Sequence, residues 1–333
     1  MAGTAASACH GCGEPVGASD SFCESCGAEL APPAVSDGGG GGPQTCESCS
    51  GRISADGYCE SCGRRGRSGR DHEEVDLGMV AGVTDRGLRH SRNEDAMALA
   101  TADTVAGPAV VAVVCDGVST SARPDEASLA AARAAARVLL AAVRTGDDLL
   151  AAAPTAVRAA AAAVAGLGGP SGPARQPGDS PAATFVSAVL TREAAVVCWL
   201  GDSRAYWLPA PGSAAQQLTR DDSLAEEMVA SGLLSETDAL ASPHGHVVTR
   251  WIGADLSDPA PHVVRFEPPG PGALLLCSDG LWNYQPEAAK LAELALPAAL
   301  GDPLGAARTL VKFALDAGGA DNVTVVLAPH PPA

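Results

Sequence analysis

Acidic residues stand at the ends of apolar, strand-like segments at several points of the chain. They are Asp116-Gly117 closing VVAVVCDGV, Asp279-Gly280 closing ALLLCSDG, Asp321 before VTVVLA, and Glu94-Asp95 in the loop-like run TDRGLRHSRNEDA. A carboxylate at the end of a buried strand must be paired or bound to a cation, because burying its charge alone is costly. The pattern therefore predicts a site for a hard divalent cation with oxygen ligands, Mg2+ or Mn2+ rather than zinc.

Eight of the eleven cysteines fall in the first 62 residues and form four Cys-x-x-Cys pairs. The pairs are Cys9 with Cys12, Cys23 with Cys26, Cys46 with Cys49, and Cys59 with Cys62. This spacing predicts two structural Zn2+ ions, each bound by four thiolates, in an arrangement that resembles a double zinc ribbon. A disulfide framework is the alternative, and the lack of a secretory signal argues against it. The ribbons would serve docking or regulation, or be only a structural appendage.

The formal net charge is −17, from 22 basic and 39 acidic residues. Such an acidic chain has no electrostatic footprint for nucleic acid or an anionic membrane surface, so we expect neither as a partner. The longest apolar run is interrupted by Arg133, Arg137 and Arg144, and the N-terminus lacks the charged and apolar regions of a signal peptide. We therefore expect no membrane span and a cytoplasmic location.

Composition divides the chain into five segments. These are a first zinc ribbon at 1–30, a flexible Gly/Pro linker at 31–45, a second ribbon at 46–63, a charged linker at 64–75, and a main domain at 76–330. The first linker contains APPAVSDGGGGGPQ, which cannot bury apolar surface and should leave the two ribbons independent. A large folded core is therefore expected only in the main domain.

The main domain alternates strand-like and helical segments. Strands are expected at LGMVAGVT, AVVAVVCDG, ATFVSAVL, AAVVCWLGD, SRAYWLP, PHVVRFE, ALLLCSDG and NVTVVLA. Only three residues separate ATFVSAVL from AAVVCWLGD, a hairpin distance that requires antiparallel pairing. Helices are expected from Pro124 to Val143, in the Ala-rich segment ending at Gly166, near 287–296 and at 303–316. Antiparallel sheets with helices outside them predict a layered α+β fold.

Seven motifs follow one another along the chain: TDRGLRHSRNEDA, VVCDGVSTSARPDEAS, LGDSRAYW, LTRDDS, VVTRWIG, LLLCSDGLW and ADNVTVVL. In this order they resemble those of the metal-dependent PPM/PP2C protein phosphatases. The resemblance implies a sandwich of two antiparallel β-sheets flanked by α-helices, with a dinuclear Mn2+/Mg2+ site at one end. It also implies hydrolysis of phosphoserine and phosphothreonine on proteins by a hydroxide bridging the two ions. The partners would then be phosphorylated proteins, including a Ser/Thr kinase or its substrates.

The resemblance assigns a role to each acidic position. Asp116 would bridge the two metals, and the Gly117 carbonyl would ligate one of them. Asp279 and Asp321 would complete the second site, which Glu94 and Asp95 would hold directly or through water. Asp202 would help to bind a weaker third metal. With His90, the residues Asp116, Asp279 and Asp321 form the expected catalytic set. No nucleophilic side chain is needed, so the remaining cysteines, Cys115, Cys198 and Cys277, are interpreted as core residues.

Three positions depart from the family's pattern. His90 stands where the family has an arginine that grips the substrate phosphate, Val118 follows Asp-Gly where bacterial members have methionine, and Asn283 replaces an aspartate. Either His90 takes the gripping role with weaker affinity, or a nearby arginine, Arg86, Arg89 or Arg92, replaces the contact. The alternative to an enzyme is a weakly active or non-catalytic scaffold that binds phosphoproteins.

Overall fold

The computed structural model divides the chain into two compact units, Met1–Gly69 and Arg70–Ala333. The structure describes residues 7–8, 15–16, 51–52, 54, 59–62, 69–167, 180–210, 213–235, 238, 242, 247–253 and 260–331. The linker expected at 31–45 lies outside these residues.

In the first unit, a short strand β1 (Ser7–Ala8) pairs antiparallel with β2 (Pro15–Val16). Further along this unit, the backbone N–H of Glu60 donates to the Arg52 carbonyl at 3.0 Å. This hydrogen bond joins the segment before the last Cys-x-x-Cys pair to the pair itself.

The zinc ligands predicted in the first unit are described only in part. Cys59 is buried and Cys62 is exposed. The six other predicted zinc ligands lie outside the described residues, and they are Cys9, Cys12, Cys23, Cys26, Cys46 and Cys49. The four Cys-x-x-Cys pairs are therefore not seen to converge on two metal sites, and the double zinc ribbon stays a prediction.

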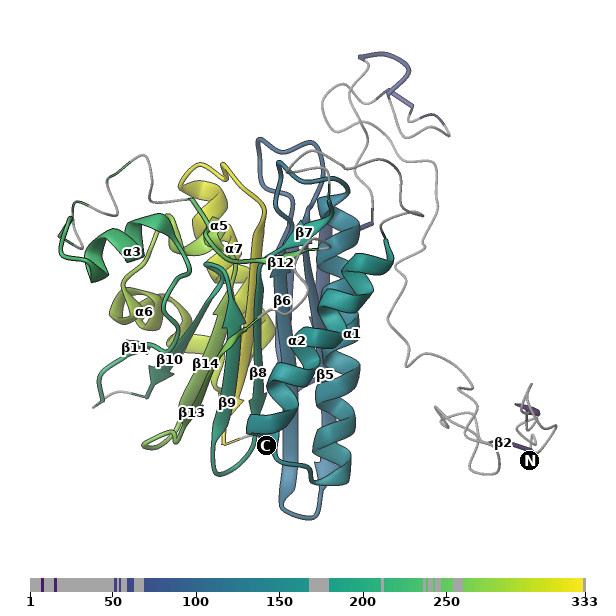
Figure 1. Cartoon of the computed structure of the whole chain (residues 1–333), viewed down its shortest axis with the longest axis vertical. Helices are drawn as coiled ribbons and strands as arrows, with labels where there is room; N and C mark the ends of the chain where they lie inside the picture. Colours follow the sequence, from purple (N-terminus) through teal and green to yellow (C-terminus); the bar gives the residue numbers. More distant parts are fainter. Residues whose placement is uncertain are drawn as a thin grey trace. The chain divides into compact units, whose positions relative to one another are not determined.

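Two antiparallel sheets form the centre of the second unit (Figure 1). The first has the order β11 (Gln216–Gln217), β10 (Arg204–Pro209), β14 (Gly272–Cys277), β15 (Val323–His330), β4 (Ala81–Asp85), β3 (His72–Asp76). The second has the order β13 (His262–Phe266), β9 (Ala195–Leu200), β8 (Phe185–Leu190), β6 (Gly107–Asp116), β5 (Asp95–Thr104). A separate small pair joins β7 (Ala182–Ala183) to β12 (Ile252–Gly253). The predicted hairpin is confirmed as β8–β9.

The side chains of β6 alternate between two cores, as the period of a strand requires. Val110 lies in a cluster with Trp207 and Leu276 of the first sheet, so this face packs between the sheets. Val111 and Val113 lie in a different cluster with the helices that cover the second sheet. The order of layers is therefore helix, sheet, sheet, helix, which confirms the predicted α+β sandwich.

Two pairs of helices cover the outer faces of the sandwich (Figure 1). The pairs are α1 (Pro124–Thr145) and α2 (Leu149–Gly166) on the second sheet, and α6 (Ala288–Ala299) and α7 (Pro303–Asp316) on the first. All four agree with the predicted helices to within a few residues. Two short helices, α3 (Leu224–Ala230) and α5 (Asp279–Trp282), were not predicted.

Helix α2 is the one described helix long and apolar enough to cross a membrane, with a mean hydropathy of 1.5. Its Ala156, Val157, Ala160 and Val164 are fully buried in the core that it shares with α1 and the second sheet. A core helix of a folded domain passes the same test of composition. The run interrupted by Arg133, Arg137 and Arg144 forms α1, whereas the helix that meets the length and hydropathy criteria is α2.

Two strands of five or more residues differ from expectation. The charged linker predicted at 64–75 ends earlier, because β3 pairs with β4 along its whole length and Asp71 before it is buried. Strand β5 was not predicted, because its sequence DAMALATADT contains four alanines, a residue depleted in strands. Pairing with β6 along all ten residues makes it a strand.

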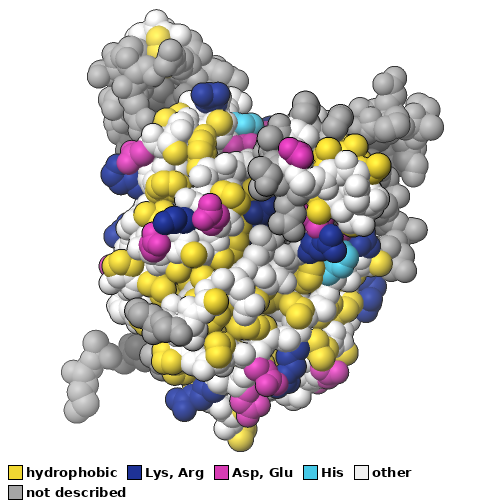
Figure 2. Space-filling view, turned by 90° about the vertical axis from the view of Figure 1, so that its left-hand side faces the viewer, with side chains coloured by type: hydrophobic (Ala, Val, Ile, Leu, Met, Phe, Trp, Pro, Cys, Tyr) yellow, Lys and Arg dark blue, Asp and Glu magenta, His cyan; other side chains and the backbone are white. Residues whose placement is uncertain are grey.

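Basic and acidic side chains are interspersed on the face drawn in Figure 2, among hydrophobic and other groups. Exposed ion pairs such as Lys290–Glu293 and Lys312–Asp316 join residues about one helical turn apart. Pairs of this kind balance charge locally and contribute little to stability. On the face in Figure 2, the acidic side chains lie at several separate places rather than in a single patch.

Candidate metal centre

The acids singled out in the sequence come from strand ends of both sheets. Asp95 begins β5, Asp116 ends β6, Asp202 lies between β9 and β10, Asp279 begins α5 directly after β14, and Asp321 precedes β15. Asp95 and Asp116 are opposite each other in the antiparallel register of β5 and β6. Like charges in directly opposed positions are destabilising. The fold therefore brings together, at one end of the sandwich, carboxylates that repel one another.

Burial and mutual repulsion raise the pKa values of three of these acids. Burial raises the pKa of Asp95 to about 7, and the charges of Asp321 and Asp279 add to the rise. Burial, followed by the charges of Asp95 and Asp279, raises the pKa of Asp116 well above its ordinary value. The pKa of Asp202 is raised in the same way, by burial and then by Asp279. Ionising all of these groups together is costly unless a cation compensates their charge.

The Asp95 carboxylate is held by one oxygen only. The hydroxyls of Ser278 and Thr324 both donate to its Oδ2 at 2.7 Å. Its Oδ1 is buried and, among the described residues, accepts no hydrogen bond. Sequence reasoning missed Ser278 and Thr324. The available signal was a hydroxyl within an otherwise apolar strand or at its end, because such a group needs a buried partner.

Glu94 is held at both of its carboxylate oxygens. Arg92 Nε donates to Oε1 at 2.9 Å, and Ser119 Oγ donates to Oε2 at 2.6 Å. The Glu94 backbone N–H donates to Asn322 Oδ1 at 2.7 Å. Glu94 thus ties its loop to the turn that follows Asp116, and each of its oxygens keeps a lone pair for a metal or a bridging water.

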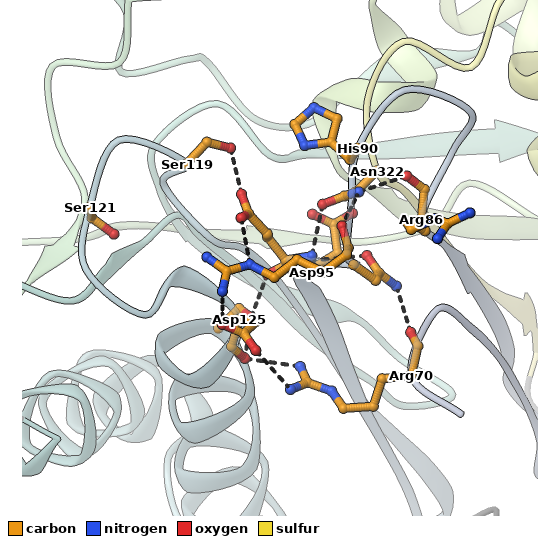
Figure 3. A network of polar contacts seen from close by, with 12 residues as sticks. Arg70, Arg86, His90, Asp95, Ser119, Ser121, Asp125 and Asn322 are labelled. Atoms are coloured by element: carbon orange, nitrogen blue, oxygen red, sulfur yellow. Dashed lines mark hydrogen bonds and ion pairs between the residues drawn. The ribbon is translucent and has the colours of Figure 1, made fainter. Parts of the chain in front are cut away.

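Two asparagines orient the site. Asn322 Nδ2 donates to the carbonyls of Arg86 and Arg92, so it bridges the loop before β5 to the start of β15 (Figure 3). Asn283, at one of the positions that depart from the family's pattern, donates from Nδ2 to Asp279 Oδ2 at 3.0 Å. The amide therefore orients a predicted metal ligand in place of adding another negative charge.

His90 faces a predicted metal ligand, with its Nε2 3.1 Å from Asp321 Oδ1. Of the three arginines that could replace it, Arg86 and Arg92 are engaged in ion pairs with carboxylates of the second unit. Arg89 is exposed. The structure places His90 at the acidic end of the sandwich, and its role toward a phosphate stays a prediction.

The glycine of the first Asp-Gly pair is required by close packing of the backbone. A Cβ at Gly117 would lie 2.5 Å from the Pro124 carbonyl oxygen and 2.7 Å from that of Glu94. The Gly117 N–H donates to the same Glu94 oxygen at 3.1 Å. Without a side chain, this turn can hold Asp116 against both the β5 loop and the start of α1.

The cysteines of the second unit carry no exposed thiol. Cys115, Cys198 and Cys277 are each at most 1% exposed. Burial raises the pKa of the Cys198 thiol to about 12 and also raises the pKa values of Cys115 and Cys277. Because the thiolate is the reactive form, none of the three can serve as a nucleophile. Their interpretation as core residues is confirmed.

The chemistry of the donors fits Mg2+ or Mn2+, since all are carboxylate or carbonyl oxygens. The buried Oδ1 of Asp95 and the raised pKa values around it favour a cation at this end. Within the described part of the chain, no three His, Cys, Asp or Glu side chains already form a metal-binding group.

We expect the metal-free protein to lose stability as the pH rises from about 4 to about 7. The folded state holds the pKa of Asp95 at about 7, whereas an aspartate in an unfolded chain titrates near 4. The folded state therefore binds more protons in this interval, and the free energy of unfolding falls as pH rises through it. Thermal unfolding in metal-free buffer should show a Tm lower by roughly 5 °C or more at the upper end.

Asp95→Asn should flatten this pH dependence, because an amide does not titrate. Asp103→Asn is the matched control, since Asp103 lies on the same strand and is exposed. A slope in Asp95→Asn equal to that of the unmodified protein would contradict the assignment.

Comparison with known proteins gives consistent matches. Residues 86–299 match the family described as Protein phosphatase 2C. The Serine/threonine phosphatase stp of Listeria innocua is 34% identical over 145 residues, which are 43% of this chain and 55% of that protein. The chain thus spans about half the length of the curated relatives it matches.

Solved structures match over nearly the whole second unit. The PPM Ser-Thr phosphatase MsPP from Mycobacterium smegmatis is 30% identical, with a TM-score of 0.59, and the match covers 76% of this chain and 99% of that one. The catalytic domain of PstP in complex with two manganese ions is 25% identical, with a TM-score of 0.52. That match covers 75% of this chain and 96% of the PstP chain.

Proposed function

The chain belongs to the protein phosphatase 2C family, and on that premise we propose that it hydrolyses phosphoserine and phosphothreonine on proteins with two Mn2+ or Mg2+ ions. One observation carries the proposal: carboxylates from both sheets meet at one end of the sandwich and raise one another's pKa values. The two manganese ions in the related PstP structure support the choice of metal.

In this proposal, the residues of the chain supply ligands and orientation. The ligands are Asp116, the Gly117 carbonyl, Asp279 and Asp321, with Glu94 and Asp95 acting directly or through water and Asp202 for a weaker third ion. When bound, such ions lower the pKa of a coordinated water and neutralise charge on phosphoryl oxygens. Ser278 and Thr324 leave Asp95 Oδ1 available by fixing its other oxygen. Asn283 orients Asp279 through Oδ2.

The test is phosphate release from a phosphothreonine peptide by the full chain, with Mn2+, with Mg2+, and with a chelator. We expect release with either metal and none with the chelator. A preparation that binds Mn2+ by calorimetry but releases no phosphate at any metal concentration would refute the proposed phosphatase activity.

A non-catalytic phosphoprotein-binding scaffold is the second candidate, and one observation favours it. Both oxygens of Glu94 already accept a hydrogen bond, from Arg92 and from Ser119. A scaffold of this kind would bind the same peptide measurably with Mn2+ present and leave it intact. Turnover of the peptide by the full chain would exclude it.

His90→Arg is expected to lower KM for the peptide by roughly three- to tenfold, with little change in Mn2+ affinity. A guanidinium can donate two parallel hydrogen bonds to a phosphate, whereas an imidazole offers one well-aimed donor. Steady-state kinetics of the variant beside Arg89→Ala and Arg92→Ala measure this. If His90→Arg changes nothing while one of the alanine variants raises KM, a neighbouring arginine holds the phosphate instead.

We propose that residues 9–62 bind two zinc ions per chain. The zinc ribbons would have a docking or regulatory role toward phosphorylated partners such as a kinase. Thiolate ligands require a reducing compartment, which is why we propose the cytoplasm. Metal analysis should find two zinc ions, and Cys46→Ser should lose one of them. Cys115→Ser is the control and should lose none, because Cys115 is a core thiol. Disulfides in this region of freshly isolated protein would contradict the proposal.

A further inference from the structure

Asp125, in the first turn of α1, is contacted by two arginines from different segments of the chain (Figure 3). Arg70 Nη2 donates to the Asp125 carbonyl at 2.9 Å, and Arg70 Nη1 lies 3.7 Å from Asp125 Oδ2. Arg92 Nη1 lies 3.4 Å from Asp125 Oδ1. Since Arg92 also donates to Glu94 at 2.9 Å, the four side chains form a continuous series from Arg70 to the metal centre.

The backbone at residues 70 and 71 also holds the loop before Glu94. Asn93 Nδ2 donates to the Arg70 carbonyl at 3.1 Å, directly before Glu94 in the chain. The Arg86 N–H donates to the Asp71 carbonyl at 2.8 Å, and the Arg86 and Asp71 side chains are 3.6 Å apart. Both ends of the segment 86–93, which carries His90, are therefore fastened to two consecutive residues.

From the sequence, Arg70 was assigned to the charged linker, because it belongs to a run of arginines after the cysteine pairs. In the structure it is the first residue of the second unit. Arg70 is not one of the residues expected to bind Mn2+ or Mg2+, the first of which along the chain is Glu94.

We propose that Arg70 is a positioning residue of the metal centre, which holds Arg92 against Glu94 by sharing the Asp125 carboxylate. Without Arg70, the Asp125 carboxylate would have Arg92 as its cation in this series, and Arg92 would be drawn away from Glu94. Glu94 and the 86–93 segment would then lose one of their restraints.

The expected effect is moderate. Outer-shell partners of metal ligands commonly change activity or affinity by ten- to a hundredfold. Here the Arg70 and Arg92 side chains are each 38% exposed, so solvent weakens their ion pairs. We expect Arg70→Gln to lower kcat by roughly three- to tenfold, with a change in KM of less than about twofold.

A double-mutant cycle on the full chain separates a positioning role from a merely structural one. The variants are Arg70→Gln, Arg92→Gln and their combination, with Arg70→Lys as the conservative replacement. Arg308→Gln is the matched control, because Arg308 Nε pairs with Glu74 at 2.9 Å and so fastens β3 to α7, on the outer face of the first sheet. One readout is backbone hydrogen exchange across residues 86–95, and the other is steady-state kinetics.

If Arg70 acts through Arg92, its removal should speed exchange in 86–95 by roughly three- to tenfold and have little further effect in the Arg92→Gln background. Arg70→Lys should recover part of the loss, and Arg308→Gln should leave exchange and kcat unchanged. Unaltered exchange in Arg70→Gln, or effects that simply add to those of Arg92→Gln, would overturn the proposal.

The kinetic readout rests on the proposed phosphatase activity, whereas hydrogen exchange does not. If the unmodified chain releases no phosphate, the proposed function fails while the exchange cycle still decides the role of Arg70. If the chain is active and the exchange cycle is additive, only the positioning role fails.

Discussion

Replacing Asp116 or Asp279 by alanine is expected to abolish metal-dependent phosphate release, with kcat/KM lower by on the order of 10³-fold or more. Asp116 lies opposite Asp95 in the β5–β6 register, and Asp279 contributes to the raised pKa values of both. Each is therefore at the point where carboxylates of the two sheets converge. Loss of either residue removes a metal-ligating carboxylate, and no neighbouring residue at the same strand end can replace it.

The same substitutions should leave the metal-free protein at least as stable as before. Each removes one charge from a set whose members raise one another's pKa values, so repulsion in the folded state falls. Activity and Tm should thus move independently, and both are measured on the same preparations. Asp103→Ala, an exposed acid at the far end of β5, is the control and should change neither. Undiminished turnover in Asp116→Ala or Asp279→Ala would refute the assignment of the metal centre.

The strand-end acids could be found from the sequence because two simple signals coincide there. A long apolar run predicts a buried strand, and an Asp-Gly pair at its end predicts a carboxylate that needs compensation. The helices were equally accessible, since α1 begins at Pro124 with Asp125 and Glu126 and ends at a glycine with a φ of 73°. Local chemistry alone determines these features.

The residues that hold the acids in place could not be found in this way. Ser278 and Thr324 reach Asp95 across separations of 183 and 229 residues, and Asn322 reaches Glu94 across 228. Such contacts depend on how the two sheets pack against each other, which no local pattern specifies. Strand β5 was missed for a related reason, because its alanine-rich sequence becomes a strand only by pairing with β6.

The second Asp-Gly pair leads to the other large expected effect, that of Gly280→Ala. A Cβ at Gly280 would lie 1.9 Å from the Asn322 carbonyl oxygen and 3.2 Å from Val323 Cγ2. The nearest atom belongs to backbone, so no rotation of a side chain can relieve the overlap. Either α5, which begins with Asp279, or the segment holding Asn322 and its hydrogen bond to Glu94 must move.

Because both movements displace groups of the metal centre, Gly280→Ala should lower stability and activity together. Overpacking of this kind costs about 3 kcal/mol or more, which corresponds to a Tm lower by roughly 6 to 12 °C for a domain of this size. Phosphate release should fall by at least about tenfold, measured well below the lowered Tm, since a displacement of about 1 Å already disturbs catalytic geometry. Gly301→Ala is the control, because a Cβ there meets no atom within 4 Å. A Gly280→Ala protein with normal Tm and turnover would show that the close approach of these two backbones does not position Asp279.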